Sequence, residues 1–180
     1  IVFGDWSSDV CSSDLPVGIS FYTFQTLSYT LDVYAGRSRP WGSLLDFSLF
    51  VTFFPQLVAG PIVRAAEFLP QCAVERRASA GQVSWGASLL VLGLFQKMVV
   101  ADGLLGPVSD KLFQGQGPFT FPDAWSGTLA FSGQIFCDFA GYSSCAVGAA
   151  LCLGFVIPSN FRMPYASIGF SDFWRRWHVS

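Results

Sequence analysis

Residues 85–101, WGASLLVLGLFQKMVVA, form the segment that most restricts how this chain can fold. They contain one charged residue, Lys97, whose long aliphatic stem can carry its ammonium to a polar boundary. An apolar helix of about this length fits the core of a large protein or a lipid bilayer. Composition decides between the two, because with 52% hydrophobic and 12% charged residues the 180-residue chain cannot cover a water-soluble surface. The sequence therefore predicts a membrane protein.

Two further apolar segments precede this one. Residues 16–34 are apolar and aromatic but carry hydroxyls, an amide and Asp32, which suits a helix that lines a cavity. Residues 43–63 are interrupted by Pro55 and by Gly60 and its following proline. Because proline frees backbone groups that neighbours must satisfy, we expect a kinked or re-entrant element here.

Residues 102–123 follow it and contain four glycines and three prolines, so we expect them to be non-helical over most of their length. Two more apolar segments come after them. Residues 125–139 and 142–157 are rich in small side chains, which favours close helix packing, and we expect a hinge at Gly141. The sequence thus predicts an all-α, multi-pass membrane protein of four to five membrane elements with kinked or re-entrant segments.

Residues 1–15 differ from the rest of the chain. They are polar, repeat the triplet SSD at 7–9 and 12–14, and lack the basic start of a signal peptide. We interpret them as a foreign or disordered terminus, and residues 16–180 as a single partial membrane domain.

Several kinds of chemistry are excluded by residue usage. Five cysteines without a C-x-x-C pair, and a single histidine, predict neither a disulfide framework nor a metal site. Because basic residues run no longer than pairs of arginine, no nucleic-acid partner is expected. No G-x-S-x-G motif is present, so a serine-hydrolase site is not predicted.

A polar face inside the apolar segments is formed by Gln134, Asp138 and Tyr142, which are spaced four residues apart. These side chains could line a substrate passage, or they could form an interhelical hydrogen-bond set with Lys97 or an arginine as partner. A conduit of this kind also suits a non-catalytic multi-pass subunit of a transport or export system. The residues alone leave these alternatives open.

The last ten residues, SDFWRRWHVS, hold most of the remaining reactive groups. Arginines between tryptophans are typical of a membrane interface, and His178 could be one more interfacial residue. A neutral imidazole is also the usual general base of acyl transfer. On a helix, Asp172 would pair with Arg175 or Arg176. The candidate passage residues of this segment are Asp172, Trp174, Arg175 and Trp177, with His178 as the candidate catalytic residue.

Four stretches of this sequence resemble the membrane-bound O-acyltransferase family. They are PVGISFYTFQTLSYTLDVY, FFPQLVAGPIVRAAEFLPQ, QIFCDFAGYSSCAVGAALCLGF and NFRMPYASIGFSDFWRRWHVS. The nearest branch looks like the bacterial alginate O-acetyltransferase type, related to the D-alanine transfer protein of teichoic acid modification. The resemblance covers residues 16–180.

The resemblance implies a multi-pass enzyme with a funnel through the bacterial inner membrane. It implies that the enzyme passes an acyl group, an acetyl group in this branch, to a hydroxyl of a polysaccharide such as alginate. It implies that His178 is catalytic and that a second histidine follows further downstream. We therefore expect this chain to be an internal fragment that is inactive alone. Ser144 stands where many relatives carry an acidic residue, which bears on acceptor choice.

The same resemblance implies the molecules that the enzyme meets. The substrate would be an activated acyl donor, an acyl-CoA or an acyl carrier, and no bound cofactor is expected. The partners would be membrane lipid, the polysaccharide acceptor, and periplasmic or extracellular acetyltransferase proteins.

Overall fold

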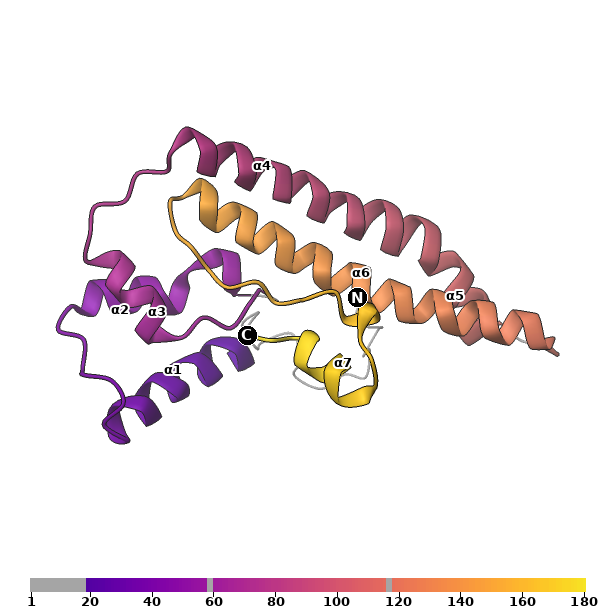
Figure 1. Ribbon diagram of the computed structural model, residues 1–180, viewed down its shortest axis with the longest axis horizontal. Coiled ribbons are helices and arrows are strands. Elements are labelled where there is room, and N and C mark those ends of the chain that lie inside the picture. The colour runs from indigo at the N-terminus through magenta and orange to yellow at the C-terminus, as the bar shows by residue number, and fades with distance from the viewer. Residues whose placement is uncertain (1–18, 58–59, 116–117) are drawn as a thin grey trace, which may run out of the picture.

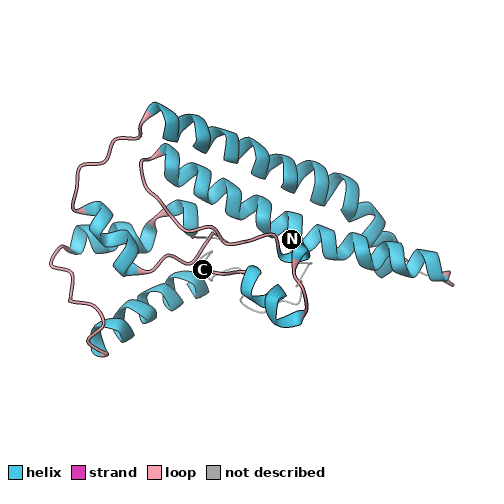
Figure 2. Cartoon of the chain, in the orientation of Figure 1, coloured by secondary structure: helices cyan, strands magenta, loops and turns pink. Residues whose placement is uncertain are grey.

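The computed structural model describes residues 19–57, 60–115 and 118–180. The predicted foreign terminus, residues 1–15, lies outside this part of the chain. Every regular element within the described ranges is helical, as Figure 2 shows. The predicted all-α class is confirmed.

One long helical rod follows residue 79 and is built of three consecutive pieces. They are α4 (Ala80–Leu94), the π-helix η3 (Phe95–Leu105) and α5 (Gly106–Phe113). Ser79 starts the rod with a capping box, because its hydroxyl accepts from the Gln82 backbone N–H and the Gln82 side chain accepts from the Ser79 N–H. The rod spans Ala80–Phe113 and is apolar enough to cross a membrane.

The rod corrects the prediction that residues 102–123 are mostly non-helical. Pro107 lies at the start of α5, where the π-helix gives way to the α-helix, and the rod continues through it. Gly106 is buried, and its N–H bonds to the carbonyl of Ala101, five residues back. Packing of η3 and α5 against α6 (Phe121–Cys152) offsets the low helix propensity of the glycines.

Helix α6 is continuous through Gly141, so the predicted hinge and the division into two segments are wrong. Gly141 serves packing instead: a Cβ added there would lie 2.7 Å from the carbonyl oxygen of Gly93. Gly148 repeats this contact one heptad later, where a Cβ would lie 2.6 Å from the carbonyl oxygen of Gly86. Small residues thus let α4 and α6 approach closely along their length, as Figure 1 shows.

The elements before residue 73 are shorter. They are α1 (Ile19–Tyr34), α2 (Leu44–Thr52), η2 (Phe54–Gln56) and α3 (Ala65–Cys72). The predicted break in residues 43–63 is confirmed, because α2 ends at Thr52 and a 3-10 turn containing Pro55 follows. In the described residues two helices, Ala80–Phe113 and Phe121–Cys152, are long and apolar enough to span a membrane, which is fewer than the predicted four to five elements.

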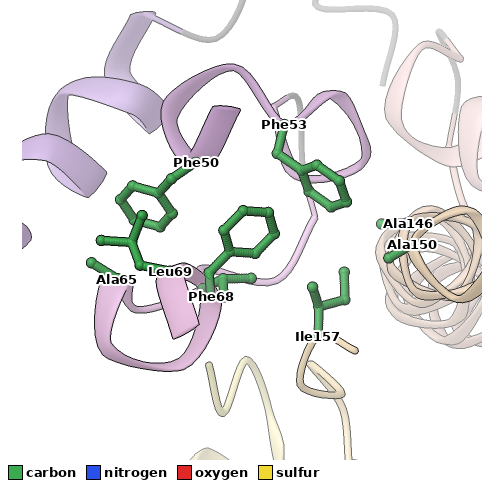
Figure 3. Close-up of a cluster of buried hydrophobic side chains, with 9 residues drawn as sticks. Phe50, Phe53, Ala65, Phe68, Leu69, Ala146, Ala150 and Ile157 are labelled. Carbon is green, nitrogen blue, oxygen red and sulfur yellow. The ribbon is translucent and has the colours of Figure 1, made fainter. Parts of the chain in front are cut away.

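A buried apolar cluster joins these short helices to α6. Phe50 from α2 and Phe68 from α3 are both fully buried, with ring centroids 5.8 Å apart. Figure 3 shows Phe53 beside them and Ala150 of α6 facing the cluster. Burying an aromatic ring removes a large apolar area from contact with solvent, so this cluster fixes the N-terminal helices to the long pair.

After α6 the chain turns back and runs beside that helix, as Figure 1 shows. Gly154, with φ +83°, makes the turn, in a conformation that favours glycine. The side chain of Gln71 in α3 then holds the returning segment, since it donates to the Val156 carbonyl (2.9 Å) and accepts from its N–H (3.0 Å). Two short elements follow, η4 (Pro164–Ala166) and α7 (Phe170–Arg176).

Candidate functional site

His178 occupies the position directly after the C-cap of α7. The cap residue is Trp177, whose N–H bonds to the Phe173 carbonyl (2.9 Å). Trp177 is already extended (φ −92°, ψ 124°), and His178 after it has φ +51°, in the left-handed region that favours glycine. A residue with a Cβ pays about 1 kcal/mol or more for this conformation. The chain therefore keeps an imidazole where local backbone energetics favour glycine.

The backbone around His178 is held by the returning segment. The Val179 N–H donates to the Asn160 carbonyl (2.9 Å), and the Arg162 N–H donates to the Arg176 carbonyl (2.9 Å). These two bonds flank His178 on both sides. Its left-handed conformation is thus fixed by tertiary contacts, the situation in which backbone strain persists.

The side chain of His178 faces an aromatic surface made by α6 and the returning segment. Its ring centroid lies 5.6 Å from that of Phe139. Phe139 in turn meets Phe161 edge to face (5.9 Å), and Trp177 meets Phe161 in the same way (5.1 Å). The imidazole is half-buried, with the Phe139 ring beside it.

Asp172 has a local role in α7. Its carboxylate accepts from the Arg176 Nε (2.9 Å) and from the Ile168 N–H (3.1 Å). These two hydrogen bonds hold the pKa of the Asp172 carboxyl below its usual value, and the bond from Arg176 has the larger effect. The predicted pairing on a helix is confirmed with Arg176 as the partner, while Trp174 and Arg175 are exposed. The passage role of Asp172, Trp174, Arg175 and Trp177 stays a prediction.

The structure separates Tyr142 from the other two residues of the predicted polar face of α6. Gln134 and Asp138 line a pocket of about 770 Å³ between α6 and the η3–α5 rod. Within the described part of the chain Tyr142 does not belong to that lining and lies half-buried one turn further on. The passage role of these three residues stays a prediction.

Lys97 is the interhelical partner considered for this face. Its ammonium pairs with Asp138 across the helix interface and with Asp102 at 2.9 Å. Asp102 lies five residues after Lys97, and the i to i+5 hydrogen bonding of a π-helix brings residues at this spacing onto one face. The π-helix thus places two carboxylates around one lysine.

Sequence reasoning missed Asn160, the only asparagine in the chain. Its side chain is 1% exposed, donates to the Ser143 hydroxyl (3.1 Å) and accepts from the Ser180 hydroxyl (3.0 Å). The one available signal was its place two residues after Pro158, which predicts only a turn. Its partners lie 17 and 20 residues away, so no local pattern could reveal them.

The long apolar helices, the ion pair between them and the arginine-tryptophan segment beside them together define a helical membrane protein. The chain belongs to the membrane-bound O-acyltransferase family, whose family model matches residues 37–180.

Three relatives illustrate the range of proteins to which the chain is similar. It is 43% identical over 166 residues to a probable alginate O-acetylase AlgI of Pseudomonas syringae pv. tomato, covering 92% of this chain and 32% of the relative. It is 33% identical to a peptidoglycan O-acetyltransferase of Helicobacter pylori (92% and 36%) and 29% identical to a teichoic acid D-alanyltransferase of Bacillus subtilis (91% and 42%). The chain spans about a third of the length of the first of these relatives.

Proposed function

We propose that the protein is a membrane-bound O-acyltransferase that transfers an acetyl group to a hydroxyl of a polysaccharide such as alginate. Family membership supports the reaction class. The alginate O-acetylase relatives, at 41–43% identity, support an acetyl group and a uronic-acid polysaccharide over the D-alanyl transfer named for more distant relatives. The same findings favour an acyltransferase over a non-catalytic export subunit.

The observation that carries the proposal is the conformation of His178. A histidine held at φ +51° keeps its side chain at a conformational cost that glycine would avoid. Strained backbone of this kind clusters at functional sites. Within the proposed reaction the imidazole accepts the proton of the acceptor hydroxyl, or orients that hydroxyl, while the oxygen attacks the acyl carbonyl carbon. The carbon–sulfur bond of the thioester donor then breaks, and the donor leaves as a thiol that carries this proton.

The surroundings of the reaction follow from the same proposal. The donor is an activated acyl ester, an acyl-CoA or an acyl carrier, and the enzyme lies in the bacterial inner membrane as a multi-pass protein surrounded by lipid. Periplasmic or extracellular acetyltransferase proteins are its partners in this proposal. Trp174, Trp177 and Arg175 anchor the segment at the membrane interface.

The test substitutes His178 in the product of the complete gene and measures ester-linked acetyl groups on the exported polysaccharide. His178→Ala is expected to abolish acetylation while polysaccharide export continues. His178→Asn and His178→Gly accommodate the left-handed backbone, so loss of acetylation in both assigns the effect to the imidazole and not to the fold. Acetylation that persists in His178→Gly would refute the proposal, and loss of export in all three variants would favour the export subunit.

A further inference from the structure

We propose that Asn160 is a positioning residue for His178, a role that rests on the function proposed above. Asn160 sits in the returning segment and is almost fully buried. Its own backbone carbonyl accepts from the N–H of Val179, the residue directly after His178. Any displacement of Asn160 is therefore passed to the backbone of His178 through a single hydrogen bond.

The side chain of Asn160 fixes that carbonyl in place from two directions. Its Nδ2 donates to the Ser143 Oγ in α6 (3.1 Å), which ties it to the helix that also carries Phe139. Its Oδ1 accepts from the Ser180 hydroxyl (3.0 Å). The Ser180 oxygen in turn accepts from the Ile62 N–H (3.0 Å), so the link extends to the segment before α3.

This arrangement locks both the position and the conformation of the imidazole. Ser143 and Phe139 lie one turn apart on α6, so the anchor of Asn160 and the ring beneath His178 belong to one rigid helix. Hydrogen bonds to Asn160 hold residues 179 and 180 and so compel residue 178 into the left-handed region. A buried polar link that is satisfied on all sides gives this kind of specificity, because breaking it leaves polar groups unpaired.

Ser143 offers a mild way to break the link. Ser143→Ala removes the acceptor of the Asn160 amide and leaves Asn160 itself in place. Ser144→Ala is the matched control, because the Ser144 hydroxyl donates within α6 to the Ala140 carbonyl. Ser143→Thr keeps the hydroxyl, and the pocket of about 340 Å³ beside Ser143 and Asn160 has room for the added methyl group.

His178 is the only histidine in the chain, so histidine labelled with ¹⁵N and ¹³C gives one set of imidazole signals in the 180-residue chain in lipid nanodiscs. We expect these signals to carry a ring-current shift from Phe139. Asn160→Ala and Ser143→Ala should move them toward the values of a free histidine, while Ser144→Ala leaves them unchanged and Ser143→Thr restores them. If Asn160→Ala reduces the helical circular dichroism signal, that variant has lost its fold. In that case Ser143→Ala and Ser180→Ala test the positioning role.

Acyl transfer by the complete gene product provides the second readout. A reacting group displaced by about 1 Å costs on the order of 10²-fold in rate, so kcat should fall by about that factor in Ser143→Ala with KM little changed. Imidazole signals that stay unchanged in Ser143→Ala and Asn160→Ala would overturn the positioning role. If the signals move but acyl transfer persists, in these variants and in His178→Gly, it is the proposed function that fails.

Discussion

Gly141 of α6 lies so close to Gly93 of α4 that a Cβ added to Gly141 would stand 2.7 Å from the Gly93 carbonyl oxygen. Two helices long enough to cross a membrane thus meet through their backbones and not through interlocking large side chains. This contact explains why α6 passes straight through Gly141. The glycine is occupied by a neighbouring helix and has no freedom to act as a hinge.

Substitution of Gly141 by alanine should therefore push the two helices apart. Because the nearest atoms belong to backbone, which cannot rotate away, we expect a loss of about 1–3 kcal/mol in unfolding free energy. Gly81→Ala is the control, since a Cβ there meets only the Ser79 hydroxyl at 4.0 Å, and should be neutral or slightly stabilising. Thermal unfolding in detergent, followed by circular dichroism, measures both. Equal melting temperatures for the two variants would contradict the close contact.

Substitution of Lys97 by methionine should remove the cation that joins η3 to α6. Asp138 is buried (9% exposed) but Lys97 is partly exposed (31%), so we expect a loss of about 1–3 kcal/mol, between the values for exposed and buried ion pairs. Lys111→Met changes the other lysine, which is exposed on the same rod, and should alter stability little. The same thermal measurement applies. A Lys97→Met protein as stable as Lys111→Met would show that the pair contributes nothing.

Substitution of Phe68 by alanine should loosen the cluster that holds α2 and α3 to α6. Phe68 is fully buried among Phe50, Phe53 and Phe155, and its loss should cost about 3–5 kcal/mol. Phe54, in the preceding element η2 and 63% exposed, provides the matched control when it is replaced by alanine. Limited proteolysis after residue 73 reports whether the N-terminal helices separate. Cleavage at the same rate in both variants would count against the cluster as the point of attachment.

Acid should weaken α7 through Asp172. The hydrogen bond from Arg176 lowers the folded-state pKa of this carboxyl most, and the hydrogen bond from the Ile168 N–H lowers it further. The ionised carboxylate therefore stabilises the folded protein. This stabilisation is present in full above the pKa of the unfolded state, about 3.9, and is lost as the pH falls through the lower pKa of the folded state. Tryptophan fluorescence of the segment, titrated from pH 6 downward, should therefore change below about pH 4. Asp172→Asn should abolish that transition, and a transition unchanged by the substitution would exclude Asp172 as its source.

Local sequence patterns predicted a large part of this structure. The helical class, the break at Pro55 and the Asp172–Arg176 pair all depend on residues within a few positions of one another. Proline geometry, apolar composition and i+4 spacing act at that range. The same rules failed for residues 102–123 and for Gly141, where glycine and proline suggested interruptions that helix packing overrides.

The sequence alone determined that this chain is a helical membrane protein with a candidate catalytic imidazole at His178, because composition and a contiguous motif carry that information. Only the tertiary structure decided how the imidazole is held. Its left-handed backbone depends on Asn160 and its ring faces Phe139, 18 and 39 positions earlier in the chain. Contacts at that separation form only when α6 and the returning segment fold against each other, and no local propensity encodes them.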